Sequence, residues 1–165
     1  MSIEDRRSKE KASRRKAILT AAEKRFAKEG FHVTTLEQVA ADIDISKATI
    51  YLYFTNKEEL LFSILEEKFE NYIQHIRGRL EGVRSLREAL TEMVTEGLHF
   101  LKRNHHFFRL AMVEQSKFEQ TLSQEMRQRF IQRQIEFLAL IENTFAGRMK
   151  TESITSFSPR SLALC

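Results

Sequence analysis

The sequence is poor in the residues that interrupt helices. Its 165 residues include one proline and five glycines. No alternation of polar and apolar residues is long enough to indicate a half-buried strand. Apolar residues instead recur three and four positions apart along most of the chain, which is the spacing of one helical face. The sequence therefore predicts an all-α protein.

Cysteine and long apolar runs are equally scarce. The single cysteine is Cys165, which excludes a disulfide within one chain and a cysteine metal cluster. The longest apolar runs are about five residues, far below the roughly 20 that a membrane helix needs. The charged N-terminus is not followed by the apolar core of a signal peptide. We expect a cytoplasmic protein that does not contact a membrane.

Residue sets that support catalysis or metal binding are lacking as well. The chain contains no recognisable nucleophile–base–acid set, glycine-rich phosphate loop or zinc-protease helix. His105 and His106 are adjacent, so they point to different sides of a helix, and His99 has no cysteine with which to share a metal. The sequence predicts no enzyme activity, no cofactor and no metal site.

Positive charge is concentrated near the N-terminus. Residues 1–57 contain 12 Lys and Arg against 8 Asp and Glu, whereas residues 58–165 contain 15 of each kind. Seven basic side chains lie within the first 16 residues: Arg6, Arg7, Lys9, Lys11, Arg14, Arg15 and Lys16. Such a segment either contacts the phosphates of a nucleic acid or is a solvated tail.

Residues 34–61 are typical of a helix-turn-helix followed by a third helix. Thr34 or Thr35 can cap a first short helix that ends near Asp42, with Glu37 or Gln38 completing a capping box. Ser46 can cap a second short helix that ends near Phe54, and Asn56 a long third one. An apolar framework recurs between these caps at helical spacing: Leu36, Val39, Ala40, Ile43, Ile45, Ile50 and Phe54. In such a motif the second helix lies in a major groove of DNA.

The segments on either side complete the predicted organisation. A helix from about Ser13 to Glu29 buries one face, and Gly30 ends it with the positive φ that glycine tolerates. The long helix after Asn56 leads into the C-terminal part without a linker. We therefore divide the chain into a basic arm (1–13), a three-helix DNA-binding head (14–57) and a helical body (58–165).

Many residues of the head stand at fixed positions of a known pattern. They are Ile18-Leu19-Thr20-Ala21-Ala22, Phe26, Gly30-Phe31, Thr35, Asp44-Ile45-Ser46, Lys47 to Phe54, and Lys57 to Leu61. Through them, residues 14–73 resemble the DNA-binding head of the tetracycline-repressor (TetR) family of bacterial transcription regulators. Two positions depart from the family pattern. Asp44 replaces a turn glycine but tolerates left-handed backbone, and Ala48 replaces a glycine with a methyl group suited to a thymine methyl.

The resemblance implies roles for eight residues of the head. Thr35, Ser46, Tyr51, Tyr53 and Lys57 correspond to positions that contact DNA phosphates. Lys47, Ala48 and Thr49 lie at the start of the recognition helix, where base edges are reached. Four of these residues have an alternative role. Thr35 and Ser46 can be helix caps only, Tyr53 can be a packing residue beside Phe54, and Lys47 can be a phosphate contact.

The body is predicted to contain three further helices. Ser85 caps the first, Asn104 begins a short second one, and the third runs from about Glu119 to Phe145. In the TetR family this region binds a small-molecule effector. Five residues can line an apolar pocket here, or can be plain core: Phe100, Phe107, Phe108, Met112 and Phe118.

The C-terminal segment carries a further expectation. After Gly147 the chain becomes polar, and Ser158-Pro159 is a strong helix start that is followed by only six residues. TetR-like proteins usually continue with two helices that form the dimer interface. The chain therefore resembles a family member that ends early, through a truncation, through a frameshift, or because the segment to be produced was chosen to end there. Dimerisation is therefore in doubt for it.

The resemblance implies a function and leaves one alternative. We expect a repressor that binds a palindromic operator in double-stranded DNA as a homodimer, and that an apolar small-molecule effector releases. The alternative is a helical interaction module with a vestigial DNA-binding head, which cannot regulate because the dimer helices are missing.

Overall fold

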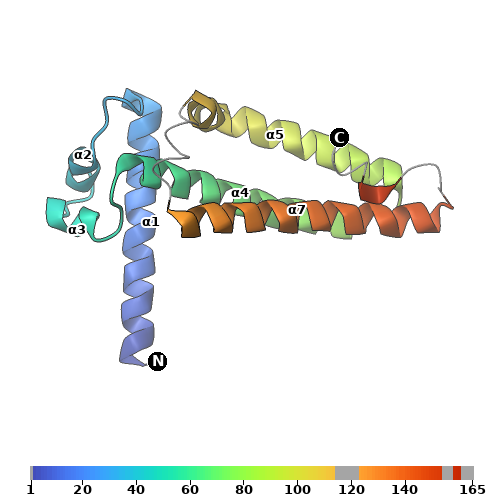
Figure 1. Cartoon of the computed structure of the whole chain (residues 1–165), viewed down its shortest axis with the longest axis horizontal. Helices are drawn as coiled ribbons and strands as arrows, with labels where there is room; N and C mark the ends of the chain where they lie inside the picture. The colour runs from blue at the N-terminus through green and yellow to red at the C-terminus, as the bar shows by residue number, and fades with distance from the viewer. Residues whose placement is uncertain (1, 114–122, 154–157, 161–165) are drawn as a thin grey trace. The chain divides into compact units, whose positions relative to one another are not determined.

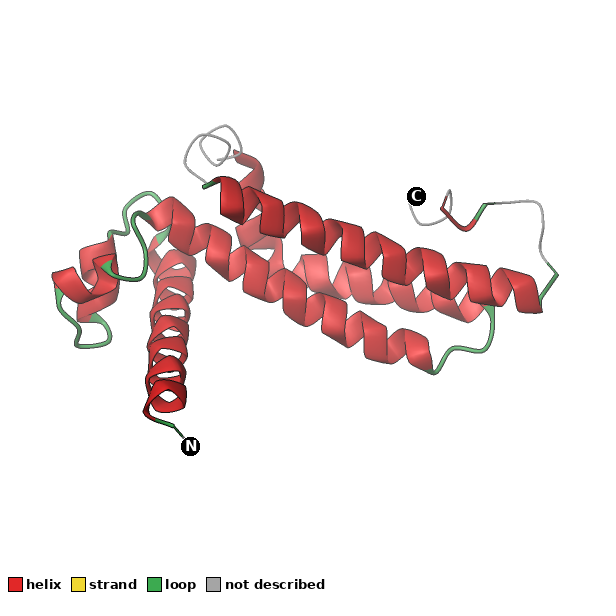
Figure 2. Ribbon diagram, turned by 60° about the horizontal axis from the view of Figure 1, so that its bottom comes forward, coloured by secondary structure: helices red, strands yellow, loops and turns green. Residues whose placement is uncertain are grey.

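The computed structural model describes residues 2–113, 123–153 and 158–160, and these residues form helices and loops only (Figure 2). The helices are α1 (Ile3–Glu29), α2 (Leu36–Ala41), α3 (Lys47–Tyr51), α4 (Lys57–Glu81), α5 (Leu86–Val113) and α7 (Gln124–Thr151). The prediction of an all-α protein is confirmed. The chain forms two compact units. From here on, the head is the first of these units, which extends beyond the predicted range 14–57 and contains α1 to α3, α4 up to Leu65 and the end of α5. The body is the second unit, which contains the rest of α4, α5 up to His105, and α7.

Helix α1 begins at Ile3, so the prediction that it starts near Ser13 is wrong. The Ser2 hydroxyl accepts a hydrogen bond from the Asp5 N–H (3.1 Å), and the Asp5 carboxylate accepts one from the Ser2 N–H (2.9 Å). This capping box satisfies two N–H groups at the start of the helix, and Arg6 pairs with Glu10 one turn later. The basic arm is therefore the first part of α1 rather than an unstructured tail.

The core of the head is formed by one face of α1 and by the elements that follow it. The buried apolar residues are Ile18, Leu19, Ala21, Ala22, Phe26, Phe31, Leu36, Val39, Ala40, Ile50, Phe54, Leu60, Leu61, Phe62 and Ile64. Gly30 ends α1 with φ 93°, as predicted. Phe31 then packs edge-on against Phe26, with ring centroids 5.2 Å apart. These contacts fix the loop that leads into α2.

In the body, α4, α5 and α7 lie side by side (Figures 1 and 2). A buried cluster holds them together: Ile76, Leu80, Val83, Leu86, Ala89, Ile141, Phe145 and Met149. The backbone N–H of Leu86 donates to Glu152 Oε1 at 2.7 Å. Because Glu152 directly follows α7, this bond joins the start of α5 to the end of α7.

Two predicted boundaries in the body need correction. Asn104 does not begin a new helix, because α5 continues unbroken to Val113 and the Asn104 amide donates to the Phe100 carbonyl at 2.8 Å. Helix α7 begins at Gln124 rather than near Glu119, because Ser123 caps it, and it continues beyond Phe145. The predicted cap of α5 is confirmed, since the Ser85 hydroxyl accepts from the Glu88 N–H at 3.1 Å. The predicted helix start at Ser158-Pro159 leads into residues 161–165, which lie outside the described part of the chain.

A membrane-spanning helix is not found within the described ranges, since each helix there is too short or too polar for that role.

Candidate nucleic-acid interface

Helix α2 begins with a reciprocal pair of hydrogen bonds. The Thr35 hydroxyl accepts from the Gln38 N–H at 3.3 Å, and the Gln38 side chain accepts from the Thr35 N–H at 2.9 Å. Thr35 and Gln38 thus form the predicted capping box. The neighbouring Thr34 is buried and donates to the Gly30 carbonyl at 2.8 Å. The Thr35 hydroxyl remains at the surface, where a second partner can reach it.

The turn between α2 and α3 depends on Asp44. Its φ is 53°, in the left-handed region where aspartate is among the few tolerated non-glycine residues. The next N–H, that of Ile45, donates to the Ala40 carbonyl at 3.0 Å and closes the turn. The prediction that Asp44 replaces a turn glycine by adopting this conformation is confirmed.

Helix α3 is short and is held at both ends. Its cap is Ser46, whose hydroxyl accepts from the Thr49 N–H at 3.0 Å and shares a 2.8 Å hydrogen bond with the Thr49 hydroxyl. Ile50 is fully buried and anchors the helix, which packs beside α2 (Figure 1). A helix this short is not stable alone, so these contacts determine where its exposed side chains lie.

The eight predicted DNA-contacting residues all have accessible side chains. Thr35, Ser46, Lys47, Ala48 and Tyr51 are exposed, whereas Thr49, Tyr53 and Lys57 are half-buried. They lie on α2, α3 and the segment that leads into α4. Their contacts with DNA remain predictions, as does the alternative of packing for Tyr53.

Glu37 joins two of these residues in the DNA-free head. Its Oε1 atom lies 2.7 Å from Lys47 Nζ and accepts a hydrogen bond from the Tyr51 hydroxyl at 3.2 Å. The Lys47 hydrogen bond lowers the pKa of Glu37 to about 2. The Glu37 carboxylate therefore pairs with two side chains that are predicted to contact DNA. No local pattern in the sequence indicates this contact, because α2 and α3 meet only after the turn has folded.

Lys57 makes internal contacts that the sequence did not reveal. Its ammonium group donates to the carbonyls of Phe31 (3.0 Å), His32 (2.8 Å) and Thr34 (3.4 Å). It also lies 4.6 Å from the centroid of the Phe31 ring. An ammonium group has three N–H donors, so these carbonyls can use all of them. Lys57 thereby connects the start of α4 to the loop before α2.

Two arginines of α1 also stabilise the head. Arg25 makes two hydrogen bonds to the Asp42 carboxylate, of 2.7 and 2.6 Å, which lower the pKa of Asp42. Arg15 donates to the Ser63 hydroxyl at 3.0 Å and lies 5.2 Å from the Phe54 ring centroid. Arg15 is half-buried and thus packs against the head, whereas the sequence left phosphate contact and a solvated tail as the alternatives for its segment. Other basic residues of α1 are exposed: Arg7, Lys11, Arg14 and Lys16.

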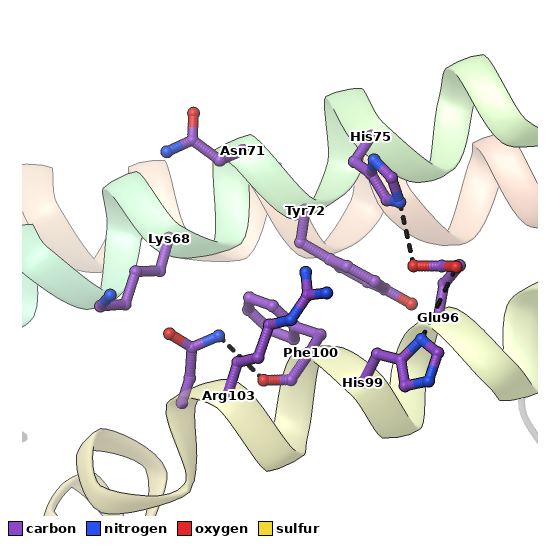
Figure 3. A pocket seen from close by; sticks show the side chains of 9 residues that line it. Lys68, Asn71, Tyr72, His75, Glu96, His99, Phe100 and Arg103 are labelled. Atoms are coloured by element: carbon purple, nitrogen blue, oxygen red, sulfur yellow. Dashed lines mark hydrogen bonds and ion pairs between the residues drawn. The ribbon is translucent and has the colours of Figure 1, made fainter.

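The predicted effector pocket is described only in part. Phe100 lines a groove of about 240 Å³ between α4 and α5 (Figure 3). Phe108 is half-buried. Phe118 lies outside the described residues, as do the side chains of Phe107 and Met112. Most residues that line the groove carry a polar or charged group, although their apolar atoms form much of its surface: Lys68, Asn71, Tyr72, His75, Glu96, His99, Phe100, Arg103 and Asn104. Within the described ranges, no group of three His, Cys, Asp or Glu residues is placed to hold a metal ion.

Comparison with known proteins identifies the head. Residues 18–64 match the family described as bacterial regulatory proteins, tetR family. The fatty acid metabolism regulator protein of Bacillus subtilis (strain 168) is 29% identical over 121 residues, which are 73% of this chain and 60% of that protein. The chain thus spans less than two thirds of the length of this curated relative.

Solved structures share the fold along most of the chain. A TetR/AcrR regulator from Thermobifida fusca has a TM-score of 0.77 and 23% identity, over 92% of this chain and 78% of that one. The regulator FadR from Bacillus subtilis, solved in complex with stearoyl-CoA, has a TM-score of 0.64 and 24% identity, over 90% and 80% of the two chains. Residues 18–64 of the head thus match the tetR family of bacterial regulatory proteins, and the all-helical fold of the described residues matches that of solved TetR/AcrR regulators.

Proposed function

We propose that this chain is a DNA-binding transcriptional regulator that represses its target by occupying a palindromic operator. One observation carries the proposal: Lys47, Ala48 and Thr49 lie accessible at the start of α3, which Ile50 and the Ser46 cap hold in place. Side chains at the start of a recognition helix are those that reach base edges in the major groove.

The remaining accessible polar groups suit phosphate contacts. Hydroxyl and ammonium groups position a protein on the duplex without reading its sequence. Thr35, Ser46 and Tyr51 supply exposed hydroxyls around α3, and Tyr53 lies on the segment that follows. Lys57 is left out of this set, because its ammonium group donates to three carbonyls of the head. The exposed basic side chains of α1 add the general attraction to DNA that depends on salt concentration.

A palindromic operator has two half-sites, and a homodimer would bind both of them. Its two recognition helices would enter major grooves about 34–36 Å apart or a multiple of that spacing. Two exposed apolar stripes of the body favour association. Val94, Leu98 and Leu101 lie on α5, and Ile131, Ile135 and Leu138 on α7, each set at the i, i+4, i+7 spacing of one helical face. Exposed apolar patches often mark interaction surfaces.

The body is proposed to bind a small-molecule effector that releases the operator. Support comes from the groove beside Phe100 and from FadR, which binds stearoyl-CoA. Release requires that the effector bind the DNA-free state more tightly than the DNA-bound state.

Selection from a random pool of DNA duplexes by the purified full chain tests the proposal. We expect enrichment of a palindrome whose half-sites are one or two helical turns apart, together with a dimer in sedimentation across a concentration series. A monomer that enriches no sequence would instead support the interaction module with a vestigial head.

A further inference from the structure

The groove between α4 and α5 carries an unequal distribution of charge. At one end, Lys68 from α4 and Arg103 from α5 extend into the gap between the helices (Figure 3). At the other end lies Glu96, the only acidic residue of the described lining. The cationic end therefore attracts anions.

The carboxylate of Glu96 already has partners within the groove. His75 Nε2 lies 2.9 Å from Glu96 Oε2, and His99 Nδ1 lies 3.8 Å from Glu96 Oε1. The hydrogen bond with His75 lowers the pKa of Glu96, so the group remains ionised at neutral pH. Both carboxylate oxygens of Glu96 therefore have an imidazole partner within the groove.

Between the two ends, the groove has an aromatic floor. The rings of Tyr72 and Phe100 stack with centroids 4.4 Å apart and an interplanar angle of 18°. Phe137 lies 5.6 Å from the Tyr72 centroid and supports the floor from α7. Burial raises the pKa of Tyr72, so its hydroxyl stays neutral at physiological pH. The floor thus offers uncharged, flat surface beside the two cations.

We propose that this groove binds a small organic anion, with a phosphate, carboxylate or sulfonate group on Arg103, whose guanidinium lies by Tyr72 (Figure 3), and an apolar, flat part on Tyr72 and Phe100. The forked donors of a guanidinium suit such oxygen-rich groups. The inference rests on the proposed function, because it assigns the chemical class of the effector. It also adds an anionic group to the apolar effector expected from the sequence.

A pair of probes with the same ring and opposite charge tests this inference. The full chain, labelled with ¹⁵N, is titrated with 2-naphthalenesulfonate and separately with 2-naphthylmethylammonium. We expect the sulfonate to bind at least about tenfold more tightly, a difference of one charge-assisted contact, and to shift amide signals of residues 68–75 and 96–104. Equal affinities, or shifts confined to other residues, would overturn the inference.

Three variants separate the groove from general surface charge. Arg103→Gln should weaken sulfonate binding by about three- to tenfold. Arg87→Gln, the matched control on the exposed surface of α5 outside the groove, should leave it unchanged. Glu96→Gln should strengthen it, because a negative charge is removed. If Glu96 had only a structural role, Glu96→Gln would not raise the affinity for the sulfonate. Equal losses of sulfonate affinity in Arg103→Gln and Arg87→Gln would contradict a localised site.

DNA binding is measured on the same samples, so the two proposals can fail separately. Sulfonate bound in the groove without any duplex binding would remove the proposed function and keep the anion site. Normal duplex binding with no preference between the probes would remove the anion site and keep the regulator.

Discussion

The head and the body are both helical but are stabilised by different kinds of contact. In the head, short helices are connected by charged side chains with defined partners, such as Lys57 on three carbonyls and Arg25 on Asp42. In the body, long helices share one buried cluster, and ion pairs between an exposed arginine and a half-buried glutamate, such as Arg79–Glu92 and Arg133–Glu70, lie along their length.

This difference matches the two tasks proposed for the chain. Reading a base sequence requires side chains in fixed positions, and the many contacts around α2 and α3 provide them. A body held mainly by one core cluster keeps a polar groove and exposed apolar stripes for other molecules. The following changes, from the largest expected effect to the smallest, test how far the two regions are distinct.

Removing one large core side chain from each region should have the largest effect. Phe54 in the head and Phe145 in the body are almost fully buried, and replacing either with alanine should cost about 3–5 kcal/mol of stability. Phe54→Ala should abolish DNA binding, whereas Phe145→Ala should leave the ¹⁵N amide signals of residues 35–57 in place. Chemical denaturation followed by circular dichroism, with NMR spectra, checks both. Loss of the head signals in Phe145→Ala would show that the regions do not act separately.

Lys57→Met should have the next largest effect, on stability rather than on salt dependence. The variant leaves carbonyls without a donor, which should cost about 1–3 kcal/mol. A lost phosphate contact would instead reduce the slope of log affinity against log salt by about 0.9. Lys47→Met is the contrasting variant: it should reduce the slope, and because it removes only an exposed ion pair with Glu37, its effect on stability should be the smaller of the two. If Lys57→Met changed the slope by the full 0.9 and left the stability unchanged, Lys57 would be a phosphate contact, as predicted from the sequence.

The turn residue should show a smaller effect whose sign depends on the substitution. Asp44→Ala places a side chain poorly suited to φ 53° in the turn and should destabilise the head by about 1 kcal/mol. Asp44→Gly should be neutral or slightly stabilising, because glycine adopts this conformation without strain. Thermal unfolding of the two variants checks the prediction, which an equally stable Asp44→Ala would contradict.

Glu37→Gln should give the smallest effect, which is seen mainly in DNA affinity. Removing the carboxylate frees Lys47 and Tyr51 from their present partner and should raise affinity for random-sequence duplex by about two- to fivefold. Fluorescence anisotropy at fixed salt measures the gain. No gain would mean that Glu37 does not compete with phosphates.

The same pair predicts a pH dependence. The pKa of Glu37 lies near 2, below its ordinary value of 4.5. The pair with Lys47 therefore stabilises the fold above about pH 4.5, and this contribution is lost as the pH falls toward 2. In Lys47→Met, the NMR titration of the Glu37 carboxylate should move up toward 4.5. An unchanged titration would contradict the contact.

Local signals were sufficient for most of the head. Caps such as Thr35 and Ser46, the Gly30 stop and the left-handed Asp44 depend on residues that are neighbours in sequence, so their chemistry could be read directly. The contacts of Lys57 and Glu37 could not be predicted, because they form only after segments far apart in the sequence have met. The start of α1 was missed because a basic segment was interpreted as an arm, although Ser2 and Asp5 form a capping box there.

The body was less predictable for a related reason. The unbroken α5 carries polar and histidine residues in its second half, which the sequence alone could not distinguish from a helix boundary. The groove depends on the distance between α4 and α5, and helix spacing does not follow from the periodicity of one helix.

The affinity of the full chain for its best selected duplex, relative to a scrambled duplex of the same composition at the same salt concentration, tests most directly whether α3 reads DNA. We predict a ratio of at least about 10³, which Thr49→Ala should reduce while leaving the affinity for the scrambled duplex unchanged. Equal affinities for the two duplexes would show that the head binds DNA through its charge alone.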